Sequence, residues 1–286
     1  MDASDLSHYS VYRTVIEQVM TGTESLPSLP SITLKVRQEI SNPNTTNRRL
    51  VAIIEKDPAL CALIIKNVSN PLFNTAAKPK DLEGILSILG MSRLNEIVML
   101  HSVKSLYTMK NPQLKALYQS AWNRLITKAT MSGVIAKLIR FPDAGQVMVT
   151  SLLTEVGTLA VLSALNQVDT VPDRATYIRL CREYSKSLGI IMLNKWGMTG
   201  VYVDVLKGIG QWSLSESDKM ELVDVINLGL YQSILWQQSG DDLPDIEDIA
   251  AFHKMPAMVK EVKENNILTA LENRREDINQ MVSILM

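Results

Sequence analysis

The stretch Leu152-Leu153-Thr154-Glu155-Val156-Gly157 is the most informative part of this 286-residue chain. It lies in an apolar run that predicts a helix over residues 143–165, and the polar pair Thr154-Glu155 interrupts that run. Threonine is a poor metal ligand, and one glutamate alone cannot hold a transition metal. The stretch therefore predicts a core element without a set of metal ligands.

Helical periodicity also describes almost all of the chain on both sides of this stretch. Asp57 and Pro58 predict a helix start, with Asp57 as the N-cap and Pro58 as the first helical residue. Gly90 predicts the end of a helix that begins at residue 82. No alternating strand pattern, Asn-Gly turn or repeat of fixed period is found. We predict an all-α multi-helix bundle, whose longer helices in the second half cover residues 114–139, 143–165, 173–184, 187–195, 198–208, 215–237 and about 268–285.

Proline-containing segments divide the chain, and Asn111-Pro112 is the best internal boundary. We expect an N-terminal helix over residues 1–23 and an N-terminal helical part over residues 24–111. A second helical part, which includes the C-terminal helices, is expected over residues 112–286.

Composition narrows the classes of function. Hydrophobic residues make up 46 %, charged residues 21 %, and the net charge is −1, which is typical of globular proteins and argues against nucleic-acid binding. Cys61 and Cys181 are expected to be reduced thiols, as in a cytoplasm. The N-terminus does not look like a signal peptide, and no uninterrupted stretch approaches 18 apolar residues, so we expect a cytoplasmic protein that does not span a membrane.

Two sets of motifs resemble a known family. Residues 152–157 keep the leucines, the β-branched residue and the glycine of the Leu-Leu-His-Asp-Ile-Gly signature of HD-superfamily metal phosphohydrolases, but Thr154 and Glu155 replace His-Asp. The N-terminal half is similar to the HDOD family, the HD-related output domain of bacterial signalling proteins, over about residues 24–210. The motifs that carry this likeness are Leu26–Pro30, Asp57–Leu60, Asn70–Phe73 and Leu82–Gly90.

The resemblance extends to single positions. Trp122-Asn123-Arg124 is similar to the Trp-x-His helix of the family, with Arg124 at the histidine position, and Ser185 stands where many members carry histidine. The resemblance thus places four vestigial positions at Arg124, Thr154, Glu155 and Ser185. It gives structural roles to Trp122, Gly157 and Trp196, beside Asp57, Pro58 and Gly90. It implies an N-terminal subdomain packed on a degenerate HD-like subdomain.

Few residues could carry catalysis. The three histidines, His8, His101 and His253, are dispersed, and no His-Asp dipeptide occurs. The acidic cluster between Asp241 and Asp248 lacks the spacing of a calcium loop. We therefore expect no catalytic residue, no metal and no cofactor.

An HD-like scaffold without its metal needs another group between the helices that held it, because an unfilled polar space in a core is unfavourable. The spacing of the motifs predicts an ion pair between Arg124 and Glu155 at the former ligand positions, or the same contact through one water.

Three functions fit the sequence. The first is a non-enzymatic bacterial regulator that contacts signalling proteins and binds neither nucleic acid nor membrane. The second is a metal-dependent phosphohydrolase or cyclic-dinucleotide phosphodiesterase with an atypical site, which metal analysis would distinguish from the first. The third is a sensor that holds a small molecule or nucleotide in the vestigial pocket near Arg124 and Glu155.

Overall fold

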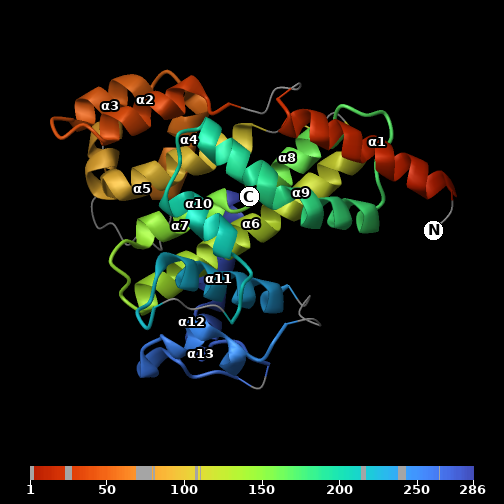
Figure 1. Ribbon diagram of the computed structural model, residues 1–286. Coiled ribbons are helices and arrows are strands. Elements are labelled where there is room, and N and C mark those ends of the chain that lie inside the picture. Colours follow the sequence, from red (N-terminus) through yellow and green to blue (C-terminus); the bar gives the residue numbers. More distant parts are fainter. Residues whose placement is uncertain are drawn as a thin grey trace.

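The computed structural model describes residues 3–22, 28–68, 79, 81–106, 109, 111–213, 217–237, 243–263 and 265–286. Within these ranges the chain is helical, apart from turns and one isolated bridge between Val262 and Leu268 (Figure 1). The prediction of an all-α fold is confirmed. Four earlier inferences fall outside the described residues: the Leu26-Pro27 dipeptide, the Asn70–Phe73 motif, the side chain of His8, and Asp241-Asp242.

Three helices of the N-terminal third, α3, α4 and α5, begin with a side-chain cap. Thr46, Asp57 and Asp81 accept hydrogen bonds from the backbone N–H groups of Arg49, Leu60 and Gly84, which lie in the first helical turn. The predicted cap at Asp57 is therefore confirmed. The helices are α1 (Ala3–Met20), α2 (Ser31–Ile40), α3 (Asn47–Ile54), α4 (Pro58–Val68) and α5 (Leu82–Ser105).

Gly90 divides α5 into two helical stretches. Its backbone has φ 72° and ψ 168°, a conformation outside the helical region that a residue with a Cβ rarely adopts. The predicted helix end at Gly90 is thus present as a sharp kink, after which the chain resumes a helix at once.

The remaining helices differ from the predicted ones at four places. The expected helix 215–237 begins only at Leu222, and the other three differences concern where helices break or continue. The expected helix 143–165 is broken at Thr154-Glu155, the expected helices 173–184 and 187–195 form one continuous helix, and the expected helix near 268–285 is broken at Asn273-Arg274. The helices of this part of the chain are α6 (Pro112–Leu138), α7 (Ala144–Leu153), α8 (Val156–Leu165), α9 (Arg174–Lys195), α10 (Val201–Gly208), α11 (Leu222–Trp236), α12 (Ala250–His253), α13 (Thr269–Glu272) and α14 (Arg275–Leu285). There are also 3₁₀ turns at Ile246–Asp248 and Ala257–Val259.

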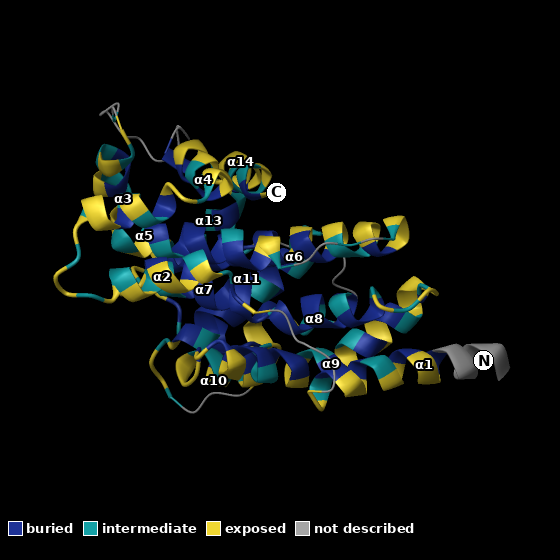
Figure 2. Cartoon of the chain, turned by 90° about the horizontal axis from the view of Figure 1, so that it is seen from above, coloured by how far each residue is buried: buried dark blue, intermediate teal, exposed yellow. Residues whose placement is uncertain are grey.

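Three apolar cores hold the helices together, and α6 takes part in two of them. One core joins α2, α3 and α4 to the first part of α5. The second joins α1, the end of α5, the first half of α6, and α7 to α9. The third packs the second half of α6 against α11 and the C-terminal helices. Figures 1 and 2 show α6 running through the middle of the molecule, with α1 lying along α8 and α9.

One described segment, Ala144–Leu165, is long and apolar enough to cross a membrane by length and composition alone. In the fold, 83 % of this apolar window is buried inside the protein, and the break between α7 and α8 divides it. Such burial is typical of core helices, and this pair carries the candidate site.

Candidate functional site

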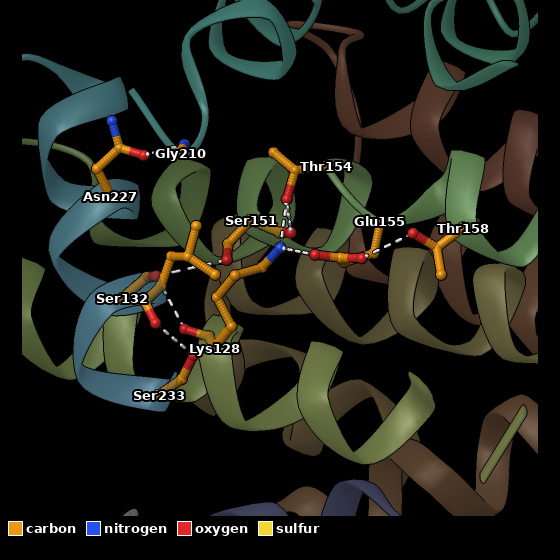
Figure 3. A network of polar contacts seen from close by, with 10 residues as sticks. Lys128, Ser132, Ser151, Thr154, Glu155, Thr158, Gly210, Asn227 and Ser233 are labelled. Atoms are coloured by element: carbon orange, nitrogen blue, oxygen red, sulfur yellow. Dashed lines mark hydrogen bonds and ion pairs between the residues drawn. The ribbon is translucent and has the colours of Figure 1, made fainter. Parts of the chain in front are cut away.

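The candidate site is the turn between α7 and α8, where the degenerate signature lies. Thr154 follows the last residue of α7 in helical conformation, whereas Glu155 has φ −105° and ψ 0°, which ends one helix and begins the next. The break turns both polar side chains toward α6 (Figure 3). A continuous helix, as the sequence predicted, would have kept Thr154 and Glu155 within one regular helical surface.

Lys128 of α6 occupies the space that these two side chains face. Its Nζ donates to Thr154 Oγ1 at 2.7 Å and to Glu155 Oε1 at 2.5 Å. The Lys128 side chain is only 2 % exposed and that of Glu155 is 31 % exposed. The ammonium group is therefore buried, whereas the carboxylate is partly accessible to water. Lys128 is the cation of this site, and it was not predicted from the sequence.

The polar groups around this ammonium are satisfied by the same two segments. Thr158 donates from Oγ1 to the second carboxylate oxygen of Glu155 at 3.0 Å, and the Thr154 hydroxyl donates to the carbonyl of Ser151 at 2.8 Å. Ser132, one turn after Lys128, donates to the Lys128 carbonyl at 2.8 Å (Figure 3). The network fixes the turn against α6 on several sides.

The carboxyl group of Glu155 is held in its charged form. Burial acts to raise its pKa, but the charge of Lys128 and the hydrogen bonds from Lys128 and Thr158 outweigh burial, with a smaller contribution from the charge of Arg124. The net effect is a pKa below the ordinary value of 4.5.

The predicted direct ion pair between Arg124 and Glu155 is wrong, because Glu155 pairs with Lys128 instead. The same contact through one water stays a prediction. Arg124 is exposed and donates from Nη1 to Ser120 Oγ at 2.9 Å. Lys128 lies four residues further along α6, so both cations share one face of the helix. Lys128 has the buried position, and the signal that could have identified it is a lone charge between Leu125, Ile126, Ala129 and Met131, which are all buried.

The α9 helix completes the surroundings of the site. Burial raises the pKa of the Cys181 thiol to about 11 and also raises that of the Tyr177 hydroxyl, so both groups are neutral at physiological pH. A neutral thiol is a weak nucleophile. These two groups therefore supply neither a base nor an activated nucleophile.

Ser185 is brought to the site through its backbone. A Cβ built on Gly157 would lie 1.7 Å from the Ser185 carbonyl oxygen and 2.8 Å from the Gly189 nitrogen. Only glycine allows α8 and α9 to approach this closely. Three of the four vestigial positions, Thr154, Glu155 and Ser185, thus lie in or next to one turn, while Arg124 is exposed and contributes to the site through its charge.

The other residues with predicted structural roles lie in the cores. Trp122 is 2 % exposed and Trp196 is 8 % exposed, and both belong to the core that contains α7, α8 and α9. Away from the site, His101 contacts Asp57 at 3.0 Å between Nε2 and Oδ2, and His253 contacts the Glu247 carbonyl at 2.7 Å. Neither histidine is placed near Glu155.

The residues at the turn do not fit a metal ion. An ammonium group lies where a cation ligand set would be needed, and it is accompanied by one hydroxyl and one carboxylate. Within the described ranges no group of three or more His, Cys, Asp or Glu side chains could hold a metal ion. The positive charge of Lys128 performs the cross-linking that a metal would give, without any Lewis acidity.

Comparisons with known proteins agree with this architecture. The family model of the HDOD domain matches residues 26–207. No curated protein matches the sequence. A solved structure from Shewanella amazonensis SB2B, provisionally named a metal-dependent phosphohydrolase, is similar with a TM-score of 0.76 at 15 % identity, covering 97 % of this chain and 98 % of that one.

Two further solved structures share the fold. An HDOD domain protein with unknown function from Geobacter sulfurreducens has a TM-score of 0.65 at 12 % identity, with 96 % of this chain and 97 % of that chain covered. A protein from Marinobacter aquaeolei VT8, provisionally named a signal transduction protein, has a TM-score of 0.61 at 14 % identity, with 97 % and 66 % covered.

Proposed function

The chain belongs to the HDOD family, and we propose that it is a non-enzymatic regulatory protein of the bacterial cytoplasm that acts by contacting signalling proteins. The observation that carries the proposal is the buried ammonium of Lys128, which takes the place of a metal between α6 and the α7–α8 turn. In HD-type hydrolysis the metal lowers the pKa of a bound water to make the nucleophile, and a lysine cannot do so.

The rival function is phosphohydrolysis, which the name of the S. amazonensis structure suggests. Its chemistry would need a metal ligand set or an activated nucleophile at the turn. Lys128 would repel a divalent cation at short range, and Cys181 is held as a neutral thiol. The Lys128 ammonium already bonds the Glu155 carboxylate, which weakens the case for a sensor that holds a small molecule near Arg124 and Glu155.

The lack of activity is tested on purified protein incubated with Mn²⁺, Fe²⁺ or Zn²⁺ and then dialysed. We expect no stoichiometric metal by elemental analysis and no hydrolysis of bis-p-nitrophenyl phosphate or a cyclic dinucleotide above a heat-denatured control. One retained equivalent of metal, together with turnover that disappears in Glu155→Ala, would overturn the proposal.

The regulatory role is tested by cross-linking in native cells followed by purification of the tagged chain. We expect one recurrent partner that itself carries a signalling domain, recovered at a constant ratio to the tagged chain. Recovery of chaperones alone, at yields that follow the unfolded fraction, would contradict it.

A further inference from the structure

A separate cavity of about 320 Å³ lies between the N-terminal part and the HD-like part of the molecule. Its walls come from α4, α5, α6, α7 and α14, and the residues that line it do not include Lys128, Thr154 or Glu155. The volume is at the lower end of the range for small-molecule sites in proteins. The cavity is therefore suited to a small ligand.

The α6 wall is a single helical stripe. Thr130, Gly133, Val134 and Lys137 follow one another at helical spacing and all line the cavity. Seven residues of helix extend about 10 Å, which sets the length of a ligand that lies along the stripe. Gly133 leaves the middle of this wall open, since a Cβ there would meet only Met148 Cβ, at 3.9 Å.

Thr130 provides the first sign of a missing partner. It is 3 % exposed, and its hydroxyl has no hydrogen-bond partner among the described residues. A buried hydroxyl without a partner is destabilising, so its retention in a cavity wall points to a group that enters the cavity and bonds to it.

The charged side chains that line the cavity indicate the charge of a ligand that could bond to Thr130. Arg93 forms an ion pair with Glu96 and donates from Nη2 to Asn67 Oδ1 at 3.3 Å, and Lys137 lines the rim with an exposed side chain. The lining thus carries two cations against one carboxylate. Asp143 is close to Glu96, but it does not line the cavity and instead caps α7 by accepting from Gln146 N–H at 2.9 Å.

Apart from Ser92, most of the remaining lining is apolar. Met148 faces α6 across the cavity, and α14 contributes Met281, Ile284 and Leu285 to the lining. Methionine adapts to ligands of varied outline because its side chain is unbranched and polarizable. The apolar lining residues are Val68, Ile88, Leu89, Val134, Ala144, Met148, Met281, Ile284 and Leu285.

We propose that this cavity binds a small amphipathic carboxylate. The carboxylate balances the excess positive charge of Arg93 and Lys137 over Glu96, and it accepts a hydrogen bond from the Thr130 hydroxyl. The apolar body lies against Met148, Met281 and the end of α14. A ligand so placed contacts both parts of the molecule and the C-terminal helix at once, and stabilises their packing by mass action.

The probe is octanoate, titrated into protein whose methionine methyl groups carry ¹³C. We expect saturable chemical-shift changes at Met148 and Met281, and none at Met192 or Met255, which lie in cores away from the cavity. Octan-1-ol and octylamine, which match the chain but not the charge, are expected to bind at least tenfold more weakly. Equal binding of octan-1-ol, or octanoate shifts that are absent or spread over all methionines, would overturn the proposal.

Two matched threonines locate the site. Thr150, like Thr130, is buried with an unpartnered hydroxyl, but it does not line the cavity. Thr130→Val should weaken octanoate about tenfold or more, as expected for a lost hydrogen bond to a charged group, while Thr150→Val leaves affinity unchanged. Because neither hydroxyl has a protein partner, both variants should fold.

A third variant fills the cavity. Gly133→Leu projects a side chain into the open middle of the stripe and should abolish the octanoate shifts while the unliganded spectrum away from Met148 and Met281 stays the same. Should that variant fail to fold, Lys137→Gln, at the exposed rim, tests the same site. We expect it to bind octanoate more weakly than the wild type and to bind octan-1-ol with unchanged affinity. Full octanoate affinity in Thr130→Val and in the rim variant would refute the assignment.

Discussion

At the scale of single residues, the turn between α7 and α8 is held to α6 by a side-chain cation. The ammonium of Lys128 is bound by one hydroxyl and one carboxylate from the α7–α8 turn, and it is almost wholly buried. A buried ion pair contributes little net stability compared with apolar packing, but the loss of one partner leaves an uncompensated charge. The pair therefore acts mainly by fixing how α6 meets the turn.

The two ends of the pair should respond unequally to truncation. Glu155→Leu leaves the ammonium of Lys128 buried and unpaired, and should lower the free energy of unfolding by about 3–5 kcal/mol. Lys128→Met leaves a carboxylate that is already partly exposed to water, and should cost less. The double variant should cost less than the sum of the two, because no lone charge remains. Urea denaturation of all three variants measures the coupling.

Arg124 supplies the matched control. It is exposed on the same face of α6, so Arg124→Met should change the free energy of unfolding by no more than about 0.5 kcal/mol. If Arg124→Met lowered the free energy of unfolding as much as Lys128→Met does, the arginine, and not the lysine, would be the residue that stabilises Glu155.

The lowered pKa of Glu155 predicts a dependence of stability on pH. In the unfolded chain this carboxyl titrates near its ordinary value of 4.5, and in the folded protein it titrates lower. Its contribution to stability is complete above pH 4.5, declines as the pH falls toward the folded pKa, and is lost below it. The stability difference between the wild type and Glu155→Gln should shrink as the pH is lowered from neutrality through this window. Urea titrations at successive pH values measure it, and a constant difference would contradict the assignment.

At the scale of helices, the contact between α8 and α9 depends on glycines. Gly157 lies against the Ser185 backbone, and Gly189 faces both Gly157 and Leu206. A methyl group at Gly157 would overlap a carbonyl oxygen, which cannot move without the rest of α9. Close crossing at this point also holds the α7–α8 turn in register with its neighbours.

Gly157→Ala should therefore destabilise the protein by about 1–3 kcal/mol or more, the usual range for overpacking a core. Gly133→Ala is the matched control, because it is also a helical glycine but has space for a methyl group. That control should be neutral or more stable by up to about 1 kcal/mol, since alanine favours helix. Thermal melts of both variants measure the contrast, and equal melting temperatures would show that the α8–α9 crossing adjusts freely.

At the scale of the whole molecule, α14 returns to the N-terminal part. Lys66 of α4 donates to the Ile284 carbonyl at 2.8 Å, and Lys104 of α5 donates to the Met286 carbonyl at 2.5 Å. Both accepting carbonyl groups lie at the C-terminal end of α14. The last carbonyl groups of a helix have no partner within the helix, and cations are favoured there. Burial and the charge of Lys66 lower the pKa of Lys104. The two bonds hold α14 over the cavity.

Removal of these bonds should loosen α14 alone. Hydrogen exchange of the double variant Lys66→Met, Lys104→Met should be faster in residues 275–286 by several fold, the effect of losing two interactions of about 0.3–1 kcal/mol each. Lys186→Met is the control, because Lys186 donates in the same way to the Lys207 carbonyl at the end of α10. Faster exchange in α14 in that control, or throughout the double variant, would show that the effect is not local.

The amino-acid sequence alone determined the helices and most of their ends. The caps at Asp57 and Asp81 and the kink at Gly90 depend on short-range hydrogen bonds and on backbone conformations that only certain residues adopt. The family likewise followed from motifs in order along the chain. Local features of this kind can be read in sequence because their partners lie within a few residues.

Only the tertiary structure decided what lies at the degenerate site. Whether Arg124 or Lys128 meets Glu155 depends on the rotation of α6 and on the break between α7 and α8, and a helical pattern does not distinguish residues four positions apart on one face. The cavity beside Thr130 has the same origin, since its walls come from helices as distant in sequence as α4 and α14. Charge pairing between distant segments is a property of packing, so a local pattern could mark Lys128 as a buried charge but could not specify its partner.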